Sequence, residues 1–340
     1  MFAPPTRLQL AAVVLVVVVV TTAFAWLAFA AIEKPTVNGS PPRSSGYFST
    51  VPPGSWKNLP SDVACRERVH RSTWEPRPDN WVPNHTMPIG RRVRASLAAQ
   101  PRSSHPRWNS WLLARVTGHH VGTTDENIQW AACKWGISDN LLRALAVRAS
   151  TWYQYEVYPN GTCVLTFGCG DLLTTSNRAT REYCAGISQA GHNYERDFGA
   201  GRCPKTFSIV GVMSWQDPSW GRPPGQQNGT FPFVRDSTAF ALDYLASYLR
   251  GCDEGWVHWL SDTGDHTYAP GDIWGCVGSL YAGAWHTKPA ADFIADVRDQ
   301  LRNHTWLDPA FAEFKPPCSL RFGGCPHGLS KAYERRVLRQ

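Results

Sequence analysis

Apolar residues recur with helical spacing along much of the chain, and the short stretch 139–152 shows it most clearly. Leu141 and Leu145 are four positions apart, so they lie on one face of a helix. Ala149 is the next position on that face. We therefore predict a helix over 139–152 whose apolar face points into a domain core.

Start and stop signals predict four more helices. Thr123 and Glu126 have capping-box spacing, and Gly136 is suited to end the helix that follows them. The other expected starts are Ser138 or Asp139 for the helix described above, Asp236 or Ser237 for a helix ending at Gly251, Asp272 for a helix over 273–282, and Pro289 for an amphipathic helix with Phe293, Ile294, Val297 and Leu301 inward. A mainly helical fold follows.

The remaining stretches lack this periodicity. We expect residues 33–105 to be a Pro/Ser/Gly-rich linker, of which Cys65 and the stretch 72–80 dock on the main domain. The main domain is expected at 106–310, with disulfide-pinned loops and short strands over 153–207. Residues 311–340 form a basic tail.

Residues 10–32 contain no charged side chain and are long enough to span a bilayer as one helix. Arg7 on the short side favours a cytoplasmic N-terminus for residues 1–9. The run Ala28-Phe29-Ala30 resembles a signal-peptidase site, so cleavage near Ala30 stays an alternative. Either way, we expect an extracytoplasmic protein, anchored by a single pass or secreted.

The ten cysteines all lie after this apolar segment, which agrees with an oxidising compartment and up to five disulfides. Cys252 and Cys276 flank one loop between two predicted helices and form the pair that we expect first. Zinc is the weaker interpretation because the chain has no CxxC motif. The histidines are scattered without metal-ligand spacing, so we expect no metal and no cofactor.

Composition and charge limit the classes of partner that we expect. Sixteen tryptophans exceed ordinary usage and can serve as core or as platforms for sugar rings. The net charge of +7 is modest, and no Lys/Arg block is long enough to indicate nucleic acid. The sequence identifies no protein partner.

Several stretches, in this order and spacing, resemble the lysozyme-like lytic transglycosylases, which include the soluble lytic transglycosylases and goose-type lysozymes. The stretches that carry the resemblance are Gly122–Gly136, Ala146–Trp152, Gly211–Ser214, Gly229–Pro232 with Arg235–Thr238, and Gly271–Cys276 through Tyr281–Gly283. The resemblance implies an α+β lysozyme-like domain that binds the glycan strands of peptidoglycan. The family reaction is non-hydrolytic cleavage between N-acetylmuramic acid and N-acetylglucosamine, which forms a 1,6-anhydro product.

The resemblance also assigns the site. The family helix ends in Glu-Ser, and these positions are Ala149 and Ser150 here. The expected substrate-binding positions are Gly211, Met213, Ser214, Tyr281, Gly283 and Trp152. Ser214 replaces a family Gln, and Tyr281 replaces a family Asn.

Alanine cannot act as an acid, and loss of general acid catalysis costs about 10²–10⁴-fold in rate. We therefore expect cleavage to be very weak or absent. Ala149 is interpreted as natural loss of the acid, as an introduced change, or as an ordinary inward alanine. The alternative functions are a non-catalytic envelope scaffold and a glycoside hydrolase that uses another carboxylate. Glu156, Asp171, Asp217 and Asp236 are the candidates for that carboxylate.

Overall fold

The computed structural model of the chain describes residues 39–98, 105–154, 178–189, 203–216, 226–227, 229–262 and 267–313. The expected membrane helix at 10–32 and nearly all of the basic tail lie outside these ranges. Within them, no helix has the length and apolar character needed to cross a bilayer. The described unit is mainly helical with little strand, which confirms the predicted helical class.

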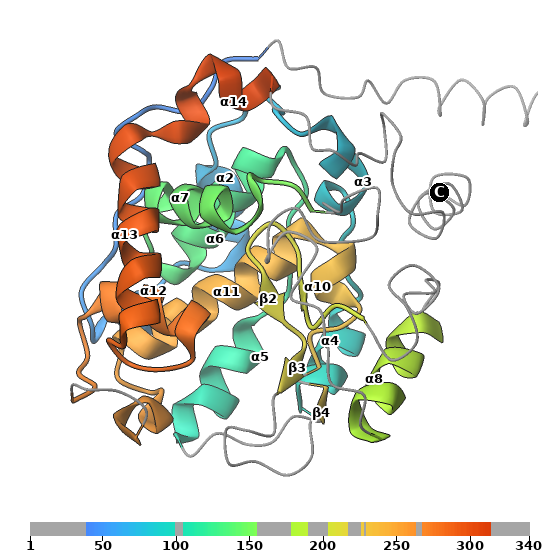
Figure 1. The fold of residues 1–340 in the computed structure, drawn as a ribbon. Helices are drawn as coiled ribbons and strands as arrows, with labels where there is room; N and C mark the ends of the chain where they lie inside the picture. The colour runs from blue at the N-terminus through green and yellow to red at the C-terminus, as the bar shows by residue number, and fades with distance from the viewer. Residues whose placement is uncertain are drawn as a thin grey trace, which may run out of the picture. The chain divides into compact units, whose positions relative to one another are not determined.

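Helices occur along the whole described chain, including the segment expected to be a linker (Figure 1). Those of the first half are α2 (Asp62–Arg68), α3 (Trp81–Asn84), α4 (Gly90–Ala98), α5 (Leu113–Arg115), α6 (Thr124–Trp135) and α7 (Asp139–Ser150). Those of the second half are α8 (Arg178–Gln189), α10 (Phe233–Asp236), α11 (Thr238–Asp253), α12 (Ile273–Ala282), α13 (Lys288–Asn303) and α14 (Pro309–Glu313). Short turns of helix are η1 (Ser55–Asn58), η2 (Pro78–Asn80), η3 (Trp108–Leu112), η5 (His258–Asp262) and η6 (Thr305–Leu307).

The strands are short and pair within two hairpin-like sheets. β1 (Thr206–Phe207) pairs antiparallel with β2 (Val212–Met213), and β3 (Trp215–Gln216) pairs antiparallel with β4 (Gln226–Gln227). The core is helical: α11 packs against α6 and α12, and α13 packs against α7 and α12 (Figure 1).

Local signals set the ends of the central helices. The capping box forms as predicted: Glu126 N donates to Thr123 Oγ1, and Thr123 N donates to the Glu126 carboxylate. Gly136 ends α6 in the left-handed conformation, with φ 58°. Of the two caps proposed for α7, Ser138 is the one that accepts from the helix, from Leu141 N.

At the start of α11 the cap is likewise the serine. Ser237 accepts from Phe240 N, whereas Asp236 pairs with Arg235 at 2.7 Å. An aspartate N-cap at 236 is therefore wrong for this structure. The helix also continues to Asp253, two residues past the predicted end at Gly251.

Buried ion pairs join the helices where sequence periodicity predicted only apolar contacts. Lys134 on α6 is completely buried and lies 2.7 Å from Asp243 on α11 and 2.8 Å from Asp62 on α2. Arg143 on α7 is also buried and pairs with Asp125 and Asp139, each at 2.7 Å. Such charges are tolerated in a core because each has a partner.

The described residues 39–98 of the segment expected to be a linker are built into the domain. Cys65 on α2 forms a disulfide with Cys133 on α6, and Val93 and Leu97 of α4 are buried. The predicted docking of 72–80 is present, since Trp74 is buried in the same core. Short helices of this kind give weak periodic patterns because tertiary contacts, not their own sequence, stabilise them.

Another helix appears within 153–207, where we expected loops with short strands. α8 occupies Arg178–Gln189, and Cys184 within it is bonded to Cys203. The expected Cys252–Cys276 disulfide is present and joins α11 to α12. Three disulfides among the described residues support the prediction of a disulfide-rich domain.

Candidate functional site

The C-terminal end of α7 is the position that the sequence singled out. Ala149 is buried, with 5% of its surface exposed, but it lies outside the contiguous apolar cluster that includes Leu141 and Leu145. The helix stops one residue later because Thr151 turns left-handed, at φ 53°, and its N–H donates to Val147 O. The helix end is therefore sharp, and Ala149 lies in its last turn.

Ser150 ties this end to the first small sheet. Its hydroxyl donates to Ile209 O at 2.8 Å, in the turn between β1 and β2. Gly211 completes that turn at φ 61°, where a side chain is strained. The predicted positions 150 and 211 thus belong to one local arrangement, in which Ser150 has a structural hydrogen bond.

The residues after Gly211 differ in exposure. Met213 on β2 is half-buried, and its carbonyl accepts from Thr230 Oγ1. Ser214 is buried, with its hydroxyl bonded to the Tyr183 hydroxyl and to Lys205 O. The Ser214 side chain therefore stabilises the sheet, whereas Met213 keeps part of its surface open.

The α12–α13 pair approaches α7 from another side. Tyr281 at the end of α12 is 44% exposed and stacks on Phe293 of α13, with ring centroids 5.0 Å apart. Arg148, the neighbour of Ala149, lies over the same Phe293 ring and pairs with Asp296 at 2.7 Å. Tyr281 is thus an exposed aromatic ring linked to the end of α7 through one shared neighbour.

Gly283 has a conformational role beside Tyr281. It ends α12 in the left-handed region, at φ 62°, and its N–H donates to Ser279 O. The structure gives it no other function.

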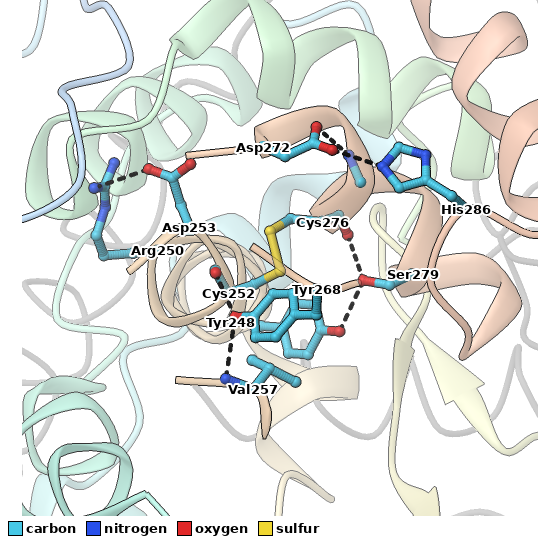
Figure 2. Close-up of a disulfide and its surroundings, with 11 residues drawn as sticks. Tyr248, Arg250, Cys252, Asp253, Val257, Tyr268, Asp272, Cys276, Ser279 and His286 are labelled. Atoms are coloured by element: carbon cyan, nitrogen blue, oxygen red, sulfur yellow. Dashed lines mark hydrogen bonds and ion pairs between the residues drawn. A yellow bond between two sulfur atoms is a disulfide. The ribbon is translucent and has the colours of Figure 1, made fainter. Parts of the chain in front are cut away.

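The position of α12 is fixed by the contacts around its disulfide (Figure 2). Cys276 is bonded to Cys252, and Ser279 shares a 3.0 Å hydrogen bond with the Tyr248 hydroxyl. Asp272 caps the helix through Gly275 N and lies 2.6 Å from His286 Nε2. These contacts hold α12, and with it Tyr281, in a defined place.

Trp152 does not fit the binding role expected for it. Its ring is completely buried, edge-on to Trp74 and Phe311, and its indole N–H donates to Arg143 O. A buried ring cannot stack on a sugar, so Trp152 is a core residue. Its large apolar area makes burial the favoured outcome next to a sharp helix end.

Of the alternative carboxylates, Glu156, Asp171 and Asp217 lie outside the described residues. Asp236 is paired with Arg235, as described above. A buried carboxyl group that sequence reasoning missed is Glu75, in the docked segment. It accepts from Thr124 N at 2.7 Å and from Asn84 Nδ2 at 2.8 Å, and burial raises its pKa to about 7.

Glu75 belongs to a polar network that reaches the residues after α7. Thr124, its partner, also accepts from Asn80 Nδ2, and the same Asn80 amide donates to Trp152 O at 2.6 Å. Arg77 Nε donates to Thr151 O at 2.7 Å. The segment 75–80 therefore supports the chain reversal that ends α7.

Among the described residues, no group of three or more His, Cys, Asp or Glu side chains is placed to hold a metal ion. Comparison with known proteins gave no relative: no protein-family model, no curated protein and no solved structure matches the chain.

Proposed function

We propose that this domain binds the glycan strands of peptidoglycan at the end of α7 and that it does not cleave them at an appreciable rate. The observation that carries the proposal is the meeting of three separate stretches at this helix end. Ser150 holds the β1–β2 turn, and Arg148 shares Phe293 with the exposed Tyr281. These are the stretches whose order resembles the lytic transglycosylases.

The missing acid explains the second half of the proposal. A lytic transglycosylase needs one carboxylic acid to protonate the glycosidic oxygen and then to act as a base. Position 149 supplies a methyl group instead, in a buried setting. A glutamate placed there would have a raised pKa because burial disfavours its charged form, which is the property that a general acid needs.

The decisive experiment compares this chain with an Ala149→Glu variant on purified peptidoglycan. We expect both to pellet with the wall and only the glutamate variant to release 1,6-anhydro-muropeptides. Ala149→Gln is the matched control, since it adds the same bulk without an acid. Equal release by all three chains would refute the role given to position 149.

Binding is tested separately in the same material. If neither the chain nor its glutamate variant pellets with peptidoglycan, glycan binding is refuted whatever the cleavage assay gives. If binding occurs and the glutamate variant is inactive, the chain is a binding protein whose site differs from that of the enzymes.

The location proposed for the domain is outside the cytoplasm, either anchored through residues 10–32 or released by cleavage near Ala30. The Cys65–Cys133, Cys184–Cys203 and Cys252–Cys276 disulfides support an oxidising compartment. Alkaline extraction of membranes from cells that make the chain separates an anchored form, which stays in the pellet, from a released one.

A further inference from the structure

A second surface, formed by α4 and by the residues before α4 and α6, combines exposed apolar side chains with arginines. Residues 80–124 contain neither Asp nor Glu, and their arginines include Arg91, Arg92 and Arg94 on α4. The large apolar side chains that stand exposed in the described chain include Met87 at 53%, Ile89 at 48% and Val121 at 39%. We call these six residues the apolar–basic patch.

Backbone contacts bring the two halves of this patch together. Gly122 N donates to Asn84 O at 3.3 Å, so the chain before α4 runs beside the chain before α6. Gly90 lies against the His119 ring, and Gly118 lies against Pro88. Met87 and Ile89 flank the buried Pro88, so they project to the same, solvent-facing side.

Among the described residues of the neighbouring helices α2 and α6, no carboxylate is paired with an arginine of the patch. Arg91, Arg92 and Arg94 are exposed, and the Arg94 guanidinium reaches back toward Gly90. On α2, Asp62 pairs with Lys134 at 2.8 Å, and Glu67 is exposed to solvent. On α6, Glu126 serves the capping box and pairs with Arg71. Arg66 of α2, whose side chain reaches His119 O, adds a further cation.

We propose that the apolar–basic patch docks on the surface of a bilayer that carries anionic lipids. Aliphatic side chains that enter the boundary between headgroups and acyl chains, with arginines on anionic headgroups, are the combination that such a surface binds. A soluble anionic polymer would attract the arginines but would leave Met87, Ile89 and Val121 in water. The exposed aliphatic side chains therefore favour the membrane.

Chain length agrees with this partner. The expected membrane helix ends at Ile32, and residues 33–38 separate it from the first described residue, Gly39. A tether of that length reaches about 20 Å when extended. A membrane helix at 10–32 would raise the effective concentration of the patch at the bilayer surface. This inference is independent of glycan binding at α7.

The test uses the full chain bound to vesicles of phosphatidylcholine, with or without phosphatidylglycerol. A photo-crosslinking benzoylphenylalanine replaces Met87 in one version and Lys288 in the control version. Lys288 lies on α13, and its side chain is 83% exposed. Lipid adducts are counted by mass spectrometry after irradiation.

We expect about tenfold more lipid adduct at position 87 in anionic than in neutral vesicles, and little at position 288 in either. Salt near 1 M, where the Debye length is about 3 Å, removes the difference. Arg91→Glu with Arg92→Glu also removes it. Arg178→Glu with Arg302→Glu changes the net charge equally at two exposed positions elsewhere and leaves the adducts unchanged.

Equal adducts at positions 87 and 288, or adducts at 87 that do not respond to lipid charge, overturn the proposal. Absence of lipid adducts together with Arg91/Arg92-dependent binding of a purified anionic wall polymer also overturns it and assigns the patch to that polymer. Circular dichroism of each variant verifies that it is folded.

Discussion

Glu75 shows at the scale of one residue how the docked segment responds to pH. The carboxyl group is fully enclosed, and burial raises its pKa from 4.5 to about 7, partly offset by donors from Thr124 and Arg77. Between these two values the folded chain keeps a proton that the unfolded chain has lost. The free energy of unfolding therefore falls as pH rises through this window, by about 3 kcal/mol from this group.

Replacing Glu75 with glutamine removes that proton equilibrium. We expect the Glu75→Gln variant to lose the fall in stability between about pH 4.5 and 7. The measurement is the unfolding free energy from urea titrations at a series of pH values. An unchanged pH profile in this variant would show that the Glu75 pKa is close to its unfolded value.

His120 gives the opposite prediction. Burial is the main cause that lowers its pKa from 6.5 to about 4, and Arg71, Arg66 and His85 act in the same direction. The unfolded chain binds a proton that the folded chain rejects between these values, so stability rises with pH across this window. We expect His120→Asn to remove a rise of about 3 kcal/mol.

The contributions of Glu75 and His120 to the pH dependence of stability partly cancel in the unmodified chain. Their pH windows overlap, and the two contributions have opposite signs. The pair of single variants separates them: Glu75→Gln should show a rise toward neutral pH, and His120→Asn a fall. Parallel profiles in the two variants would contradict both assignments. The double variant serves as the control, since it should lack both contributions.

At the scale of one element, α7 ends in two consecutive residues with positive φ. Thr151 has φ 53° and Trp152 has φ 67°, although neither is glycine. A β-branched residue in this region carries about 1 kcal/mol of strain. The bonds from Arg77 to Thr151 O and from Asn80 to Trp152 O hold the reversal in place.

Asparagine tolerates the left-handed conformation better than threonine does. We expect Thr151→Asn to stabilise the chain by about 0.5–1 kcal/mol, measured by urea unfolding at fixed pH. Thr151→Val is the matched control, because it keeps the branched shape and should not stabilise. Stabilisation by both variants would place the cause elsewhere.

The starts of α6, α7 and α12 show how far a sequence can predict a fold. The capping residues Thr123 and Glu126 and the caps Ser138 and Asp272 are local signals, and their helices begin where the pattern predicts. The burial of Trp152 depends on Trp74 and Phe311, which are distant in sequence. No local period reveals such a partner.

The candidate site also has one part that the sequence predicts and another that only the structure reveals. Position 149 follows from one helix and its resemblance, but the link from Tyr281 through Phe293 to Arg148 joins three helices. Glu75 was missed because a glutamate in a Pro-rich segment has the pattern of a surface residue. Only the docking of that segment on α6 turns it into a buried group.

At the scale of the whole molecule, residues 48–54 contact helices that are far apart in the sequence. Phe48 N donates to Asp139 at the start of α7, and Gly54 N donates to Glu254 after α11. The buried Arg250 guanidinium donates to Val51 O at 3.0 Å. The segment thus covers several helices and stabilises them together, which a flexible linker could not do.

The Cys65–Cys133 disulfide is the covalent part of this attachment, and its removal tests how much the attachment contributes. The bond closes a loop with a sequence separation of 68, against 24 for Cys252–Cys276. In the chain-entropy account, the longer loop restricts the unfolded chain more, by about 4 kcal/mol against about 3. We expect Cys65→Ala with Cys133→Ala to lower the unfolding free energy by about 4 kcal/mol, and Cys252→Ala with Cys276→Ala to lower it by about 1 kcal/mol less. Urea unfolding of both variants at one pH measures the difference. A larger loss for the shorter loop would mean that native packing around α12, and not loop closure, decides the stability of this domain.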